Sequence, residues 1–364
     1  MNFWLFVIDN LGWFGTTRFT KPIGEALNKD LYSIILCGGR GERLWPYSRE
    51  NCPKQFIKFR GDDSLLEQTI NRSKLISEHI WLLSEQKNEN LLQNLKKSVV
   101  EKVIFEPEGR NTAAAILLGC LRLEKINPNS IVVFLPSDHF ISDHKCFAIK
   151  ISQAVEEVKR TQKICLIGMK PKSASTRFGY LEADDLGEKS FSVTKFHEKP
   201  DLLTAEKYLQ DNNKFWNLGI FVGFVSSFIN EFKQHAPKVY NEVSVFINTG
   251  DSATYKDVAN ISFDHAIAEK SNNIIMLKSD FEWSDVGNLE AFLSLNNKNN
   301  SSKLIEFNSK NNLVDSNKLV VLLGVSDLCI VEQDDTLVIA KRDQVEDVKR
   351  VVHVMKEKYK ENLR

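Results

Sequence analysis

A predicted β-strand that runs directly into a glycine-rich turn is the feature that most restricts how this chain can fold. The strand covers residues 32–36. It is followed by Gly38, Gly39 and Gly41. Glycine adopts positive φ readily, so several backbone N–H groups can face one anion, and Arg43 and Lys54 can add positive charge. These residues predict a phosphate-binding loop, with an ordinary glycine turn beside solvated basic residues as the alternative.

The loop differs from two common phosphate-binding motifs. Arg43 stands where the dinucleotide-binding fingerprint has its last glycine, and no Gly-Lys-Ser/Thr sequence closes the loop as in a P-loop. Leu36 ends the strand before the turn, and we expect it to border the same site. The pattern therefore excludes the two commonest motif-based interpretations of a glycine loop.

Short runs of Ile, Val, Leu and Phe alternate with helical patterns in the following residues. The apolar runs cover residues 80–83, 103–105, 131–135 and 164–167. The helical patterns cover residues 65–76, 112–126 and 147–160. Such runs are typical of strands that are buried on both faces. The expected fold class is α/β, a doubly wound, largely parallel, Rossmann-like sheet that binds ligands at the carboxyl ends of its strands.

The pattern changes after a polar stretch at residues 296–302, which we interpret as a linker. Strand-like runs follow at residues 319–323, 328–331 and 336–340, and then a terminal helix. We therefore expect a catalytic domain over residues 31–295 and a small β-rich C-terminal module with a terminal helix over residues 303–364. Residues 1–30 form an N-terminal extension, interpreted as an upstream start, a disordered arm or a docking segment.

The composition argues against polyanionic partners. Lys plus Arg and Asp plus Glu each number 48, so no global field favours nucleic acid or an anionic membrane. The six cysteines form no Cys-x-x-Cys pair, which is consistent with a reducing cytoplasm. The apolar N-terminal residues are broken by Asp9 and lack a basic region, so neither export nor membrane insertion is expected.

Two aspartates are candidate metal ligands. Asp138 follows Ser137 at the end of the strand at residues 131–135, which is the expected ligand-binding edge. Asp285 lies in a separate segment much later in the chain. Mg²⁺ prefers one or two protein carboxylates plus phosphate oxygens, so two aspartates from distant segments suit it. The alternative for Asp138 is an aspartate that caps a turn.

The residues around the glycine turn resemble the signature of a known family. The Arg-Leu-Trp-Pro sequence at residues 43–46, Tyr-Ser-Arg at 47–49 and Pro-Lys-Gln-Phe at 53–56 are similar to those of nucleotidyltransferases that activate sugar 1-phosphates. They look like the mannose-1-phosphate guanylyltransferase branch. The resemblance covers roughly residues 31–360 through several separate motifs. It implies a short form, without the isomerase domain of longer relatives.

The resemblance also implies roles for individual residues. The implied catalytic residues are Arg43, Lys54, Asp138 and Asp285, with both aspartates binding Mg²⁺. The implied nucleotide-binding residues are Leu36, Gly38, Gly39, Gly41, Arg43, Glu106, Arg110, Asn111, Ser137 and Asp138. The implied sugar phosphate-binding residues are Gly179, Tyr180, Glu198, Lys199 and Asn217. On their residues alone, the segment at 106–112 is a capped helix start and Glu198-Lys199-Pro200 is a common strand exit.

We therefore expect an enzyme that transfers GMP from GTP to mannose 1-phosphate, releasing pyrophosphate and supplying GDP-mannose for polysaccharide synthesis. One alternative is the same chemistry on heptose 1-phosphate or glucose 1-phosphate, or with another nucleotide. Leu218 departs from the small residue expected beside Asn217, which bears on the identity of the sugar. Another alternative is a non-catalytic subunit that senses nucleotide sugars, although the retained charged residues favour an enzyme. A homodimer is expected.

Overall fold

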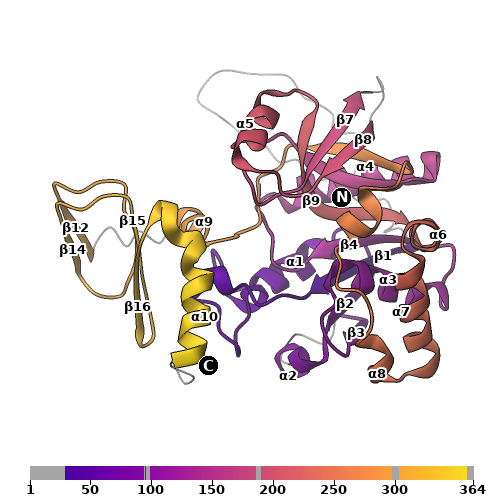
Figure 1. Ribbon diagram of the computed structural model, residues 1–364, viewed down its shortest axis with the longest axis horizontal. Coiled ribbons are helices and arrows are strands. Elements are labelled where there is room, and N and C mark those ends of the chain that lie inside the picture. Colours follow the sequence, from indigo (N-terminus) through magenta and orange to yellow (C-terminus); the bar gives the residue numbers. More distant parts are fainter. Residues whose placement is uncertain (1–28, 94, 96–98, 186–189, 297–302, 359–364) are drawn as a thin grey trace, which may run out of the picture.

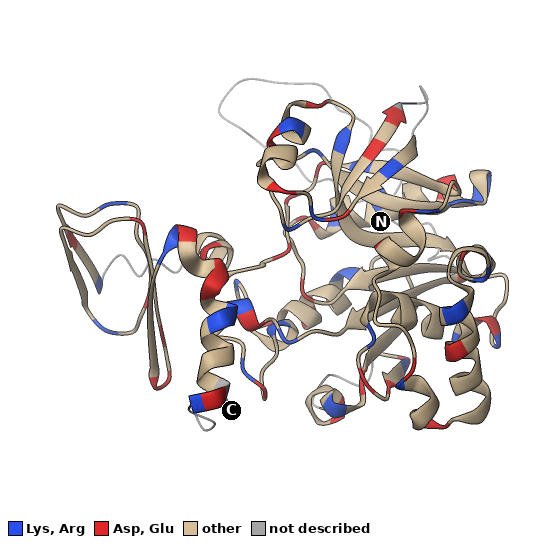
Figure 2. Ribbon diagram, in the orientation of Figure 1, with Lys and Arg blue, Asp and Glu red and all other residues tan. Residues whose placement is uncertain are grey.

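A computed structural model describes residues 29–93, 95, 99–185, 190–296 and 303–358 of the chain. The predicted N-terminal extension and the predicted linker lie almost entirely outside these residues. Figure 1 shows a large α/β part and a smaller β-rich part that carries the C-terminal helix. Positions with either sign of charge are interspersed over both parts (Figure 2), as the balanced composition predicts.

A nine-stranded sheet forms the centre of the large part, in the order β3-β2-β1-β4-β9-β6-β10-β8-β7. Its strands are β1 (Leu31–Cys37), β2 (His79–Glu85), β3 (Lys102–Glu106), β4 (Ile131–Pro136), β6 (Ile164–Met169), β7 (Tyr180–Asp185), β8 (Phe191–His197), β9 (Lys214–Phe224) and β10 (Ile274–Ser279). Neighbours are parallel from β3 to β4 and between β6 and β10, whereas β9 is antiparallel to β4 and β6. The α/β class is confirmed, but the pairing is more mixed than predicted.

Helices cover both faces of the sheet. They are α1 (Leu65–Ser73), α2 (Glu89–Leu92), α3 (Asn111–Glu124), α4 (His144–Thr161), α5 (Leu202–Gln210), α6 (Val225–His235), α7 (Pro237–Thr249) and α8 (Ser252–Tyr255). Successive residues of β1 enter different cores: Ile34 packs with α3, α6 and α7, whereas Ile35 packs with α1 and α4. Because side chains alternate across a strand, the central strands of this sheet need apolar residues on both faces, which explains their nearly continuous apolar runs.

The C-terminal module contains more strands than the sequence predicted. The predicted runs correspond to β14 (Val320–Leu323), β15 (Leu328–Gln333) and β16 (Thr336–Lys341), and they are joined by β12 (Leu304–Phe307) and β13 (Leu313–Asp315). The pairs β12–β14 and β13–β15 are parallel. A 3₁₀ helix, η6 (Arg342–Asp347), leads into α10 (Val348–Lys358). The two missed strands are only four and three residues long, so each gives too short an apolar run to identify a strand.

The module packs against the glycine-loop region through a shared apolar core. Helix α9 (Leu289–Asn296) contributes Leu289 and Phe292 to this core, and Leu44 and Trp45 come from the residues after the loop. Val345 joins them from η6. Helix α9 therefore packs against both the glycine-loop region and the C-terminal module. No helix in the described part of the chain is both long and apolar enough to span a membrane.

Candidate active site

A cavity of about 570 Å³ lies at the carboxyl ends of the parallel strands. Strands β1, β2 and β4 and the start of α3 converge there, as expected for an α/β sheet. Its lining includes Leu36, Gly38, Gly39, Glu85, Glu106, Asn111, Asp138, His139, Gly219 and Asp264. Six of the predicted nucleotide-binding residues therefore meet around one space, although they come from three separate segments.

The glycine loop has the backbone conformation that its sequence predicts. Gly39 and Gly41 have φ of 86° and 66°. A Cβ built on Gly41 would lie 2.2 Å from the Cβ of Lys54, so the loop rests directly on the lysine stem. Gly38 and Gly39 face the cavity, where an added Cβ would meet open space. Gly41 is thus required for packing, whereas Gly38 and Gly39 leave the backbone open to a ligand.

Lys54 joins the two predicted metal-binding segments. It begins η2 (Lys54–Phe56), and its Nζ lies 2.8 Å from Oδ2 of Asp138. The same Nζ donates a hydrogen bond to the backbone carbonyl of Asp285. Burial raises the pKa of Asp138, but the charge and hydrogen bond of Lys54, together with His139 and a backbone hydrogen bond, outweigh burial and leave that pKa below its ordinary value. Asp138 is therefore ionised and available as a ligand.

Helix α1 holds the Asp138 segment from behind. Thr69 donates to the carbonyl of Ser137 at 3.3 Å, and Arg72 donates to the carbonyl of His139 at 3.0 Å. Arg72 is fully buried, and burial lowers its pKa to about 9. Ser137 is buried as well and does not line the cavity. The structure therefore fixes the backbone of Ser137 through α1 and places its side chain outside the lining of the cavity.

Two aspartates at one edge suit Mg²⁺. Among the described residues, no group of three or more His, Cys, Asp or Glu side chains is gathered to hold a metal ion. Mg²⁺ commonly takes one or two carboxylates and completes its octahedron with phosphate oxygens and water. Lys54 bonds the carboxylate of Asp138 and the backbone carbonyl of Asp285, so the two segments lie side by side, while the carboxylate of Asp285 lies 3.6 Å from Arg177.

Glu106 and Asn111 line the end of the cavity beside α3. Glu106 accepts a 2.6 Å hydrogen bond from the hydroxyl of Tyr255, and burial raises its pKa to about 7. Asn111 has a φ of 64° and accepts a hydrogen bond from the N–H of Thr112. Arg110 is directed away from the cavity because its guanidinium pairs with Glu108 and donates to the carbonyl of Lys256. Of these three predicted nucleotide-binding residues, Glu106 and Asn111 line the cavity and Arg110 does not.

The predicted sugar-phosphate residues cluster near Asp264, which the sequence analysis missed. Asn217 donates to Oδ1 of Asp264 at 2.9 Å and accepts from the N–H of Gly219 at 3.1 Å. A Cβ on Gly179 would lie 2.7 Å from Cζ of Phe196 and 2.8 Å from Oε2 of Glu198, so both side chains would have to shift to admit a larger residue. Burial, followed by the charge of Glu198, raises the pKa of Asp264 to about 7. Asp264 lies in an unusual π-helical turn, η4 (Asp264–Ala268), which gives no strong sequence signal.

Tyr180 and Lys199 differ in what they can offer a ligand. The side chain of Tyr180 is fully buried, and its hydroxyl donates to the carbonyl of Ser175 at 3.0 Å. Tyr180 therefore braces the loop before β7. Lys199 has a φ of 46°, pairs with Glu198 and keeps an exposed side chain. Its ammonium group is thus accessible to a sugar phosphate.

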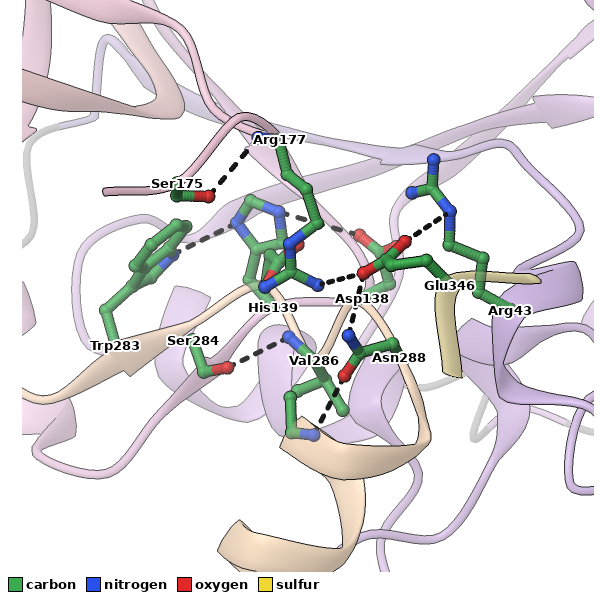
Figure 3. A network of polar contacts seen from close by, with 12 residues as sticks. Arg43, Asp138, His139, Ser175, Arg177, Trp283, Ser284, Val286, Asn288 and Glu346 are labelled. Atoms are coloured by element: carbon green, nitrogen blue, oxygen red, sulfur yellow. Dashed lines mark hydrogen bonds and ion pairs between the residues drawn. The ribbon is translucent and has the colours of Figure 1, made fainter. Parts of the chain in front are cut away.

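A second polar network lies beside the aspartates and is shown in Figure 3. His139 accepts a 3.2 Å hydrogen bond from the indole of Trp283, and its Nε2 lies 3.9 Å from Asp138. Burial lowers the pKa of His139 to about 4, so it is neutral at physiological pH. Arg177 pairs with Asp285 at 3.6 Å, and an added Cβ on Gly287 would lie 2.5 Å from its Nη1. His139 could have been predicted as a site residue because it follows Asp138 directly in the sequence. No feature of the sequence pointed to Arg177.

Arg43 lies at the rim of the site rather than in the lining of the cavity. Its Nε is 3.1 Å from Oε2 of Glu346 in the C-terminal module. The neighbouring Glu42 turns toward α10, where its carboxylate is 3.8 Å from Nε2 of His353. An acidic residue in a phosphate loop would otherwise repel an anion. The structure thus directs the carboxylate of Glu42 toward the module.

Comparison with known families agrees with this architecture. Residues 32–302 match the Nucleotidyl transferase family, and residues 302–355 match a MannoseP isomerase/GMP-like beta-helix domain. The chain therefore belongs to the nucleotidyl transferase family, and it is an enzyme of the class that transfers a nucleotidyl group to a sugar phosphate.

Individual relatives define the branch more closely. The chain is 33% identical to a mannose-1-phosphate guanylyltransferase of Salmonella muenchen, over 90% of this chain and 73% of that protein. It is 30% identical to the xanthan biosynthesis protein XanB of Xanthomonas campestris pv. campestris (strain B100), with the same coverage. A crystal structure named mannose-1-phosphate geranyltransferase from Thermus thermophilus has a TM-score of 0.82 and 25% identity, covering 90% of this chain and 99% of that one.

Proposed function

We propose that this protein transfers GMP from GTP to mannose 1-phosphate, forming GDP-mannose and pyrophosphate with the help of Mg²⁺. The observation that carries the proposal is the single cavity bordered by the glycine loop, by Glu106 and Asn111, and by Asp138. Asp264 lines the same cavity and is bonded to Asn217 of the sugar-phosphate cluster. Groups suited to a base, a phosphate chain and a sugar therefore meet in one space.

Glu106 and Asn111 would contact the guanine base. Guanine presents acceptors at O6 and N7 and donors at N1 and N2. A carboxyl group can accept from the N1 and N2 donors, and the amide of Asn111 can both donate and accept. The names of the relatives support guanosine over other nucleosides. GTP is therefore the nucleotide that we propose.

The reaction needs alignment and charge rather than a covalent enzyme intermediate. An oxygen of the sugar phosphate attacks the α-phosphorus, the bond from that phosphorus to the bridging oxygen breaks, and pyrophosphate leaves with the electron pair. N–H groups of the glycine loop, together with Lys54 and Arg43, would stabilise the charge on the triphosphate and on pyrophosphate. Lys199 would hold the attacking sugar phosphate.

Asp138 and Asp285 would hold Mg²⁺. When bound, the ion would offset negative charge on the phosphate oxygens. Lys54 keeps Asp138 ionised before any substrate binds, because its ammonium group lies 2.8 Å away. The lysine would thus prepare the carboxylate as well as contribute charge of its own.

Pyrophosphate release tests the proposal directly. The purified chain would be assayed with GTP, ATP, UTP or dTTP against mannose, glucose and heptose 1-phosphates, with Asp138→Asn as the inactive control. Release with GTP and mannose 1-phosphate well above the other pairs is the expected result. A preference for another pair would show that the enzyme carries out the same reaction on that nucleotide and sugar phosphate instead. Binding of GDP-mannose without release from any pair would support the sensor subunit instead.

A further inference from the structure

The C-terminal module places a carboxylate at the rim of the active site. Glu346 lies in η6, and its two oxygens have different partners (Figure 3). Oε1 accepts from Nδ2 of Asn288 at 2.7 Å and lies 3.4 Å from Nη1 of Arg177. Oε2 lies 3.1 Å from Nε of Arg43. One side chain therefore joins the glycine-loop region, the loop before β7 and the start of α9.

Glu346 is anchored at both ends. Beside its backbone, Val345 and Val348 are buried in the apolar core that the module shares with Leu44. At its tip, Asn288 is itself fixed, because it is buried and its Oδ1 accepts a 2.9 Å hydrogen bond from Ala291 at the start of α9. One carboxylate oxygen is therefore held in place while the other remains directed at Arg43.

The contact with Arg43 leaves the phosphate-binding edge of the guanidinium available. Glu346 engages Nε, and the two terminal nitrogens of Arg43 have no hydrogen-bond or ion-pair partner among the described residues. Those terminal nitrogens can donate in parallel to two phosphate oxygens. A guanidinium that is already held through Nε loses less rotational freedom when it binds a phosphate. The free-energy cost of ordering the side chain is therefore smaller, and the affinity for phosphate is higher.

We propose that Glu346 is a positioning residue, through which the C-terminal module orients Arg43 toward the phosphate chain of the nucleotide. This inference rests on the proposed function, and it extends the active site beyond the nucleotidyl transferase domain. The opposite role would be competition, in which the carboxylate occupies Arg43 and excludes phosphate. The pair is about half exposed, with side-chain exposures of 47% and 44%, and exposed ion pairs are weak. Such a pair can bias a rotamer but competes poorly with a triphosphate.

The test compares Glu346→Gln, Arg43→Ala and the double variant with wild type. Asp343→Asn is the matched control, because Asp343 is an exposed carboxylate in the same 3₁₀ helix. The readouts are kcat/KM for GTP in pyrophosphate release, KM for mannose 1-phosphate, and the Kd for pyrophosphate with Mg²⁺ by calorimetry. Glu346→Gln should weaken pyrophosphate binding and lower kcat/KM for GTP by about three- to fivefold. It should have little further effect when Arg43 is already alanine.

Three results would overturn the inference. If Glu346→Gln keeps the wild-type affinity for pyrophosphate and the wild-type kcat/KM for GTP, Arg43 does not need Glu346 to orient it. If the variant binds pyrophosphate more tightly than wild type, the carboxylate competes with phosphate for Arg43. An equal loss in the Arg43→Ala background, with a raised KM for mannose 1-phosphate, would indicate a general structural role. Failure of the proposed function would look different, since wild type itself would release no pyrophosphate from GTP. The calorimetric comparison would still decide the role of Glu346 in that case.

Discussion

Replacing Lys54 by alanine would remove an ammonium group that lies 2.8 Å from Asp138 and also bonds the Asp285 carbonyl. The side chains of this pair are only 9% and 29% exposed. Breaking a buried pair costs roughly 3–5 kcal/mol because one charge remains unpaired, and the partial exposure of Asp138 favours the low end, about 3 kcal/mol. Loss of the cation from the reacting phosphates should also lower kcat by at least about tenfold.

Urea unfolding and pyrophosphate release would measure the two effects separately. Lys58→Ala is the control for a lost charge in the same segment, because Lys58 is exposed, and it should change neither property. In an Asp138→Asn background the stability loss from Lys54→Ala should be smaller, since only the hydrogen bond to the Asp285 carbonyl remains to be lost. The reasoning is refuted if the loss is the same in both backgrounds, or if Lys54→Ala keeps wild-type kcat.

Four further results are expected. Asp138→Asn and Asp285→Asn should each remove most turnover, and Asp138→Asn should also lower the melting temperature because Lys54 loses its charged partner; normal activity in either variant would remove that aspartate from the metal site. Lys199→Ala should raise KM for mannose 1-phosphate more than KM for GTP, whereas equal changes would contradict its assignment to the sugar phosphate. The pKa of Asp264 is raised from 3.8 to about 7 in the folded protein. The contribution of Asp264 to the free energy of unfolding is therefore complete below pH 3.8 and is lost as the pH rises through about 7. Asp264→Asn should therefore flatten the fall in melting temperature over this range, and an unchanged profile would exclude the shift. If the chain is a homodimer that associates through the exposed apolar side chains of β12 and β14, Phe307→Glu should give a monomer by light scattering, and an unchanged mass would exclude this interface.

Much of the fold could be predicted because its strongest signals are local. Strands β1, β2 and β4 are buried on both faces, so each is a nearly continuous apolar run. Strands β12 and β13 were missed because a run of four or three residues is too short to show a strand periodicity. The position of β9, which lies antiparallel between β4 and β6, could not be predicted from local sequence either. Strand order depends on which distant segments pair.

The glycine loop, the charged residues after it and Asp138 at a strand end could all be found in the sequence, because backbone conformation and strand periodicity are properties of neighbouring residues. What those charges do was decided by the tertiary structure. Lys54 and Asp138 are 84 positions apart, and only folding brings them within 2.8 Å. Arg43 likewise meets Glu346 of another module at 3.1 Å. Charge interactions and desolvation depend on distance and burial in space, so the pKa of Asp138, the role of Asp264 and the partner of Arg43 have no local pattern to reveal them.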